Sequence, residues 1–375
     1  MFSEKARKHA DACRFCYMCR HLCPVELVTG KESNTPRAKA LLVSMMERGM
    51  PMDASCAATM YECLLCGACT ADCATGFDPL IFIREARTRA ALEGLTPDFA
   101  QRVIDRIEAT GNPYGARACA VPLEDCPESG ETLLWLGSAA RHAVPDVAAA
   151  LISLMRKAGE SFAVLREEPP SGSALGDMIG YVEDVRQQAM AAAAAIAKSG
   201  ARRLVVLDSH DCAFFLHECR EWGVSLPETI TATRFVADLI AGGRLTPRKQ
   251  MEIVSYHDAA RLARDLQELL PAREILAAMG AEVHEMFLNE RFSQHPEASR
   301  ACGSAVRARE CGSTLMGQML PSLARQLAAA RYADLLRTDA RILVSADPQA
   351  AEALRLCVPE GVQCRDLFVM LNDRV

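Results

Sequence analysis

No apolar stretch of this 375-residue chain approaches the ~20 residues that cross a bilayer, and no long run of like charge occurs in it. The first residues lead into charged side chains and cysteines instead of the apolar segment of a signal peptide. The net charge of −6, from 42 Lys and Arg against 48 Asp and Glu, does not favour a nucleic-acid backbone as the main partner. We therefore expect an acidic cytoplasmic protein with no transmembrane segment of its own and no nucleic-acid partner.

Two phosphate-binding signatures are missing as well. The chain has neither the G-x-G-x-x-G of a dinucleotide fold nor the G-x4-G-K-[ST] of a phosphate loop, and Gly30-Lys31 lacks the rest of that loop. His257-Asp258 resembles an acid–base pair, but the sequence places no nucleophile or further base beside it. No motif therefore predicts a catalytic residue in this chain.

Cysteine, in contrast, is abundant, with 17 residues in a chain long enough to fold without disulfide bonds. Eight of them form two arrays with the same C-x2-C-x2-C-x3-C spacing: Cys13, Cys16, Cys19 and Cys23, then Cys63, Cys66, Cys69 and Cys73. Three cysteines spaced three apart let one loop reach three iron corners of a 4Fe-4S cluster, and in two-cluster ferredoxins the fourth cysteine binds the other array's cluster. The resulting hypothesis is two 4Fe-4S clusters, one on Cys13, Cys16, Cys19 and Cys73 and one on Cys63, Cys66, Cys69 and Cys23.

Zinc is the alternative, because four thiolates also form a closed tetrahedral site. Zinc sites usually pair two C-x2-C knuckles across a longer gap, whereas here four cysteines fall within eleven residues, twice. The spacing favours iron–sulfur clusters, although the second array ends Cys73-Ala74 where the bacterial motif has proline, as in Cys23-Pro24.

Helical patterns surround the arrays, and a different pattern follows them. Thr35-Pro36-Arg37 predicts the start of a helix that ends at Gly49, and a second helix is expected from Ile81 to Leu95. Further along, strands and helices alternate, which predicts parallel sheets with helices on both faces. The expected strands are 132–137, 162–165, 204–208, 253–257, 282–287 and 341–345, and the expected helices are 145–159, about 177–199, 264–279 and 315–337.

The alternating pattern is duplicated, since residues 202–208 are similar to residues 339–345. We therefore expect an α + α/β fold with an N-terminal all-α, two-cluster ferredoxin-like domain over 1–112, a linker over 113–131 and two α/β repeats over 132–245 and 246–375.

The cysteine arrays, Thr35-Pro36-Arg37, the segment Thr110–Gly115 and the duplicated α/β part together resemble one family over nearly the whole chain. It is the cysteine-rich (CCG-domain) iron–sulfur family that includes the heterodisulfide reductase D subunit, the glycolate oxidase iron–sulfur subunit and the anaerobic glycerol-3-phosphate dehydrogenase C subunit. The resemblance implies electron transfer between a flavoprotein dehydrogenase subunit and a quinone or other respiratory acceptor. It also implies a membrane quinone-reactive subunit as a partner and a place on the cytoplasmic face of the membrane.

The chain departs from this family in its α/β repeats, where the family carries further cysteine elements that can hold noncubane clusters. One of those cysteines survives in each repeat, Cys212 and Cys302, while the other positions are Ser138, Pro170, Ser171, Ala260, Ala301 and Ala350. A single thiolate cannot hold a multi-iron cluster without other soft ligands. We therefore predict an α/β part without a cluster and about eight irons per chain.

The remaining cysteines do not match a metal-binding spacing as well as the two arrays do. His210, Cys212, His217 and Cys219 form H-x-C-x4-H-x-C, which has the ligand types for one zinc, but the two cysteines lie seven apart on an apolar helical pattern and favour a packing role. Six further cysteines make no ligand array: Cys56, Cys119, Cys126, Cys311, Cys357 and Cys364.

The leading hypothesis for function is an electron-transfer subunit of an oxidoreductase complex and not a stand-alone enzyme. One alternative is a redox-sensing or structural scaffold subunit of a larger assembly. The other is a heterodisulfide-reductase-like catalytic subunit, which the lost cysteines disfavour.

Overall fold

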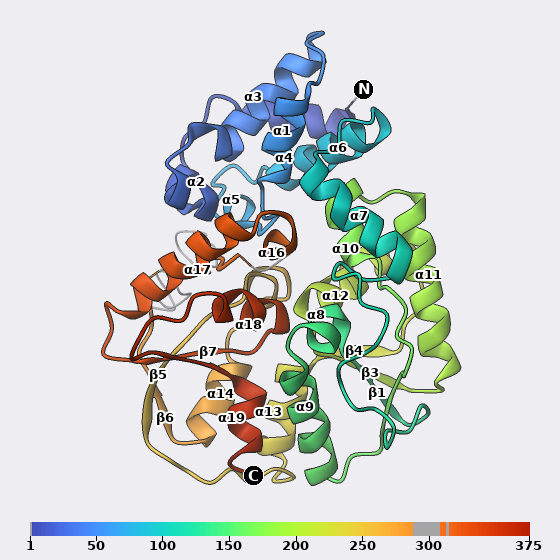
Figure 1. The fold of residues 1–375 in the computed structure, drawn as a ribbon, viewed down its shortest axis with the longest axis vertical. Coiled ribbons are helices and arrows are strands. Elements are labelled where there is room, and N and C mark those ends of the chain that lie inside the picture. Colours follow the sequence, from blue (N-terminus) through green and yellow to red (C-terminus); the bar gives the residue numbers. More distant parts are fainter. Residues whose placement is uncertain (1, 288–307, 313–314) are drawn as a thin grey trace.

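The computed structural model describes residues 2–287, 308–312 and 315–375 (Figure 1). Ala301 and Cys302 lie outside the described residues. Within them, no helix combines the length and the apolar character that crossing a membrane requires.

Residues 2–110 form helices and no strand. Ser3, Thr35, Asp53 and Asp78 each accept a hydrogen bond from a backbone amide in the first turn of the helix that follows, which fixes four helix starts. The two helices expected around the arrays are present as α3 and α6. The helices are α1 (Glu4–Cys13), η1 (Arg20–Leu22), α2 (Pro24–Thr29), η2 (Glu32–Asn34), α3 (Pro36–Glu47), α4 (Ala54–Tyr61), α5 (Ala68–Ala71), α6 (Pro79–Leu92) and α7 (Asp98–Thr110).

Two four-stranded parallel sheets follow, with the equivalent strand orders β2-β1-β3-β4 and β6-β5-β7-β8. The equivalence confirms that the α/β pattern is duplicated. The first repeat contains β1 (Thr132–Trp135), α8 (Gly137–His142), α9 (Pro145–Lys157), β2 (Phe162–Val164), α10 (Ser173–Ile179), α11 (Glu183–Lys198), β3 (Arg203–Val206), α12 (Ser209–Phe214), η3 (Phe215–Cys219), β4 (Glu228–Thr231) and α13 (Ala232–Ala241). The second contains β5 (Glu252–Tyr256), η4 (Arg261–Asp265), α14 (Pro271–Ala278), β6 (Ala281–Val283), α16 (Met316–Met319), α17 (Pro321–Leu335), β7 (Ile342–Ser345), α18 (Pro348–Arg355), β8 (Gln363–Asp366) and α19 (Leu367–Asn372).

Three expected helices are interrupted, and the prediction of continuous helices was wrong there. The segment 177–199 divides into α10 and α11 at Gly180, whose φ of 79° lies in the left-handed region. The segment 264–279 divides into η4 and α14, and the segment 315–337 into α16 and α17; Pro271 and Pro321 begin the second helix of each pair. Proline lacks the amide that would continue the preceding helix, so both breaks follow from the sequence.

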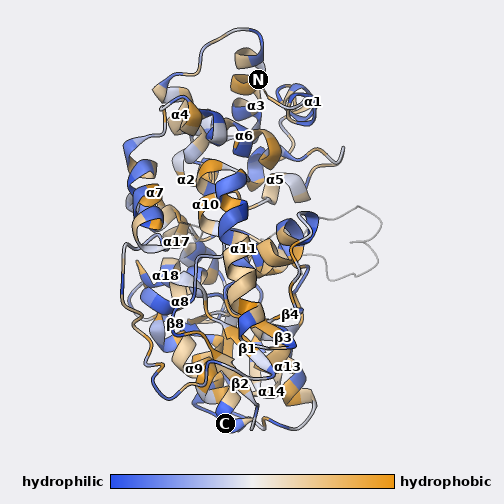
Figure 2. Cartoon of the chain, turned by 90° about the vertical axis from the view of Figure 1, so that its right-hand side faces the viewer, coloured by the Kyte–Doolittle hydropathy of each residue, from blue (hydrophilic) through white to orange (hydrophobic). Residues whose placement is uncertain are grey.

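The first sheet joins two hydrophobic cores. Leu133 and Trp135 of β1 belong to the core that includes the helical part, whereas Leu134 belongs to the core shared with the second repeat. Figure 2 shows these strands as apolar ribbons inside the molecule. Helices α6 and α7 pack on α10, and α2 packs on α17, so the helical part contacts both repeats.

The last helix of each repeat packs on the other repeat. Helix α13 contacts α14 of the second repeat, and α19 contacts α9 of the first. The strand ends are linked in the same reciprocal way. Asp208, the N-cap of α12, accepts hydrogen bonds from Gln349 Nε2 at 3.0 and 3.1 Å, and Asp347, the N-cap of α18, accepts one from the Ser209 amide at 3.1 Å.

The expected linker, residues 113–131, contains no helix or strand. Val121, Leu123 and Cys126 within it are nevertheless buried in the core with α9, so the segment is packed along the first repeat.

Candidate iron–sulfur centre

All eight array cysteines lie in the helical part, mostly on loops between its helices. The first array occupies the end of α1 and the loop to α2, and the second runs from the end of α4 through α5 to the start of α6. Cys16 is exposed, whereas Cys66 is buried and the other six are half-buried. The two arrays therefore differ in their access to solvent.

Thiols of each array act electrostatically on thiols of the other array. Cys73 acts on the pKa of Cys13 and Cys19, together with Cys16. Cys23, Cys63 and Cys66 act on the pKa of Cys69. The cross-braced pairing of the two arrays stays a prediction. In this prediction the first site is Cys13, Cys16, Cys19 and Cys73, and the second site is Cys23, Cys63, Cys66 and Cys69. Cys19 also acts on Cys69, so the two sites adjoin.

The sulfur spacing is wider than zinc needs. Among the described residues, no three of these sulfur atoms lie within 4.8 Å of one another. A zinc ion with Zn–S bonds of ~2.3 Å holds its sulfurs about 3.8 Å apart in a tetrahedron. A 4Fe-4S cluster is larger, and its thiolates bind separate iron corners, so it requires a wider sulfur spacing than zinc does.

Backbone geometry directs hydrogen bonds at the sulfur atoms. The Leu65 amide donates to Cys63 Sγ at 3.4 Å, and the Phe77 amide donates to Cys73 Sγ at 3.2 Å. Leu65 and Gly67 both have left-handed backbones, with φ of 52° and 72°, which lets the loop wrap around the second site. Hydrogen bonds to ligand sulfur are one of the features that tune iron–sulfur clusters.

The second site is surrounded by three buried cations. Lys39, Arg87 and Arg264 are 1%, 2% and 6% exposed. Lys39 Nζ donates to Asn34 O at 2.8 Å, Arg87 donates to Met60 O and Cys63 O, and Arg264 Nε donates to Cys66 O at 2.7 Å. Within the described part of the chain, none of the three forms an ion pair with a carboxylate, although paired arginines are frequent elsewhere.

Buried cations without carboxylate partners are costly unless another anion compensates them. Burial raises the pKa of the Cys66 thiol to about 12, and Arg264 opposes that rise. Four thiolates on a 4Fe-4S cluster would supply the missing negative charge at this place. The residues of the second site thus fit the cofactor on both ligand number and charge.

The first site has the opposite surroundings. On its loop, Phe15, Tyr17 and Met18 are 73%, 57% and 66% exposed. The charged group beyond the cysteines that acts on the Cys13 pKa is the Asp78 carboxylate, which raises it together with burial. The first site is therefore accessible and has no buried cation among its strongest electrostatic neighbours.

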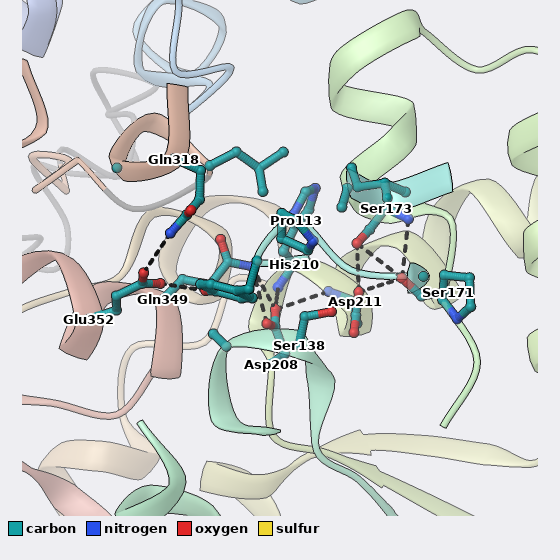
Figure 3. A pocket seen from close by; sticks show the side chains of 18 of the residues that line it. Pro113, Ser138, Ser171, Ser173, Asp208, His210, Asp211, Gln318, Gln349 and Glu352 are labelled. Atoms are coloured by element: carbon teal, nitrogen blue, oxygen red, sulfur yellow. Dashed lines mark hydrogen bonds between the residues drawn. The ribbon is translucent and has the colours of Figure 1, made fainter. Parts of the chain in front are cut away.

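A cavity of about 100 Å³ lies between the helical part and both repeats (Figure 3). Ser138, Pro170 and Ser171 lie on its wall. Asp211 accepts hydrogen bonds from Ser171 Oγ at 2.5 Å, Ser173 Oγ at 2.6 Å and the Trp135 indole at 2.8 Å. Hydroxyl, indole and carboxylate groups thus satisfy one another at this wall of the cavity.

The zinc alternative in the first repeat is not assembled. His210 Nε2 lies 3.3 Å from Asp177 Oδ2, and His217 Nε2 lies 3.1 Å from the Asp265 carbonyl. Cys212 and Cys219 are fully buried, as expected for small core side chains.

Sequence reasoning missed one group, His257, Glu310 and Cys311, whose potential ligand atoms lie within 4.8 Å of one another in the core. Arg331 Nε donates to His257 Nδ1 at 3.2 Å, and burial holds the pKa of His257 well below its ordinary value. The neutral ring therefore carries its proton on Nε2, which leaves neither nitrogen free to bind a metal. We assign no metal to this group.

Comparisons with known proteins agree with the geometry. Residues 9–77, which contain all eight array cysteines, match the family described as a 4Fe-4S dicluster domain. The chain is 27% identical over 373 residues to the D subunit of the dihydromethanophenazine:CoB--CoM heterodisulfide reductase of Methanosarcina barkeri, an alignment that covers 90% of this chain and 86% of that relative.

Two longer relatives are matched over part of their length. The chain is 28% identical over 338 residues to a Chromohalobacter salexigens protein named "Probable membrane-anchored ferredoxin", covering 84% of this chain and 48% of the relative. It is 27% identical over 280 residues to the EtfAB:quinone oxidoreductase of Syntrophomonas wolfei, covering 69% and 38%. The chain thus spans about half or less of these two proteins. In its cysteine arrays, its sheets and its relatives, the chain is similar to the iron–sulfur proteins that include the heterodisulfide reductase D subunit.

Proposed function

We propose that the chain is an electron-transfer subunit of an oxidoreductase complex, with one 4Fe-4S cluster at the first site and one at the second. A bound 4Fe-4S cluster supplies reversible one-electron transfer. The observation that carries the proposal is the proximity of the two cysteine arrays, with the exposed Cys16 in one and, in the other, the buried Cys66 beside cations that form no ion pair among the described residues.

The residues of the two sites have different tasks in this function. Cys16 and its exposed loop let a partner approach the first site closely, whereas Cys66, Lys39 and Arg264 hold the second site away from water. The electrostatic influence of Cys19 on Cys69 supports a short path between the two sites. An electron would enter or leave at the first site and be held at the second.

The partners follow from the relatives. Because one relative is an EtfAB:quinone oxidoreductase, we propose a flavoprotein dehydrogenase subunit as electron donor and a quinone or other respiratory acceptor downstream. A membrane quinone-reactive subunit would place the complex on the cytoplasmic face of the membrane.

Metal analysis tests the cofactor. Protein prepared without oxygen should contain about eight irons and eight acid-labile sulfides per chain and no stoichiometric zinc. Four irons, or zinc in their place, would contradict two clusters. Electron transfer is tested by co-purification with a flavoprotein whose substrate reduces the bound iron–sulfur chromophore; an intact complex whose chromophore stays oxidised would favour the scaffold function.

A further inference from the structure

The second repeat contributes a side chain to the second site. Arg264 lies in η4, 198 residues after Cys66, and its Nε donates to Cys66 O at 2.7 Å. Nη1 donates to Ala308 O, and Nη2 has no hydrogen-bond partner in the described part of the chain. A guanidinium that is 6% exposed thus presents an N–H group beside a cysteine of the second site.

Two neighbouring arginines show that this arrangement is specific to Arg264. Arg261 and Arg84 line the same cavity of about 330 Å³ between the helical part and the repeats. Arg261 pairs with Asp177 and Asp265 at 2.9 Å each, and Arg84 lies 3.6 Å from Asp177. Their charges are compensated by carboxylates, whereas that of Arg264 is directed at the cysteine loop.

We propose, on the basis of the function above, that Arg264, Lys39 and Arg87 raise the reduction potential of the second site above that of the first. The α/β part, which has lost the family's additional cysteines, thereby takes part in electron transfer through Arg264. One electron would pass from the first site to the second, and no bond forms or breaks.

The direction of the effect follows from charge. Reduction adds one negative charge to a cluster, so nearby cations stabilise the reduced form, while burial and carboxylates oppose it. Glu62, Glu310 and Asp177 act electrostatically on this cluster of cations and thiols and offset part of the positive charge, but none of them forms an ion pair with Lys39, Arg87 or Arg264 among the described residues. At the first site Asp78 opposes reduction, and its influence on Cys13 is not offset by a buried cation. A unit charge about 10 Å away, at an effective dielectric constant of ~20, changes an equilibrium by roughly tenfold.

Voltammetry of the full chain with both clusters tests the proposal. The wild type should show two one-electron waves. Arg264→Gln should lower the potential of the upper wave by about 59 mV. For one electron, this shift is a roughly tenfold fall in the equilibrium constant for transfer from the first to the second site. The lower wave is an internal control and should stay in place. Arg264→Lys retains the charge, so the potential of its upper wave should stay close to that of the wild type.

Arg89→Gln is the matched control, because Arg89 lies on α6 with Arg87 but pairs with Glu93. It should move neither wave. A single potential in the wild type, an unmoved upper wave in Arg264→Gln, or an equal shift in Arg264→Lys would overturn the proposal.

Lys39→Met removes a cation from the helical part and should lower the potential of the same wave. This variant tests the proposal independently if Arg264→Gln binds too little iron to be measured. Fewer than about eight irons in the wild type would instead overturn the proposed function.

Discussion

The two cysteine sites have the same spacing in the sequence and opposite surroundings in the structure. The first lies on an exposed loop with Phe15, Tyr17 and Met18, and Asp78 is the charged group beyond the cysteines that acts on the pKa of Cys13. The second is enclosed by Lys39, Arg87 and Arg264, which have no ion-pair partner among the described residues. A motif therefore sets the ligands, whereas the packing of distant segments sets the electrostatic environment and hence the role of each site.

The largest effect is expected from removing a ligand of the buried site. Cys66→Ser should lose roughly half of the iron, or all of it if the arrays cross-brace, because cluster binding is coupled to folding of the loops that hold it. Iron analysis and the visible spectrum measure the loss. Cys56→Ser is the control, since Cys56 lies outside the three-apart spacing and should keep all its iron. Full iron in Cys66→Ser would show that the ligand assignment is wrong.

The second prediction concerns an ion-pair cluster that joins the helical part to both repeats. Asp177 is 3% exposed and compensates Arg261, at 2.9 Å, and Arg84, at 3.6 Å. Asp177→Asn leaves Arg84 without this carboxylate and Arg261 with Asp265 alone, and should cost about 3–5 kcal/mol in the free energy of unfolding. Asp184→Asn, at an exposed position of α11, should change it by less than about 0.5 kcal/mol. Equal unfolding midpoints for the two variants would contradict the buried ion pair.

The third prediction concerns the pH dependence of folding stability, which a buried carboxyl outside both cysteine sites should change. Asp366, in β8 directly before α19, is 1% exposed, and burial raises its pKa to about 7 from the ordinary 3.8. The folded chain then holds this proton more tightly than the unfolded chain, so stability should fall as the pH rises from about 4 to about 7.

Asp366→Asn removes this proton but retains an oxygen that caps α19 through the Phe368 amide. The variant should gain about 2–4 kcal/mol relative to wild type at pH 8 and little at pH 4. Thermal unfolding at both pH values measures the difference. A variant that is less stable than wild type at pH 8 would contradict the raised pKa.

The smallest effect on stability is expected at the exposed site. Tyr17→Ala removes a ring that is 57% exposed, so the unfolding free energy should change by less than about 0.5 kcal/mol and the iron content should not change. Electron exchange with the flavoprotein should nevertheless slow several-fold, because aromatic side chains dominate interfaces. Met251→Ala removes a side chain that is 75% exposed at another surface and should leave the rate unchanged. Equal rates for the two variants would show that the first-site loop is not the contact.

The features that local sequence encodes were predictable. The array spacing, the Thr35 cap and the buried runs of β1 and β3 all appear where short-range pattern places them. The edge strands β4 and β8 were not expected, because Glu228–Thr231 and Gln363–Asp366 are half exposed and lack an apolar run. The approach of Arg264 to Cys66 depends on the packing of segments 198 residues apart, and no local pattern encodes it.

The exchange of terminal helices between the repeats has a consequence for synthesis of the chain. Helix α9 is covered by α19, whose residues emerge from the ribosome about 200 residues later. At ~5–20 residues per second, the surface of α9 that α19 covers stays without its partner for roughly 10–40 s. The first repeat therefore cannot complete its packing during its own translation, and a nascent chain that stops before residue 367 exposes a surface on which it can aggregate.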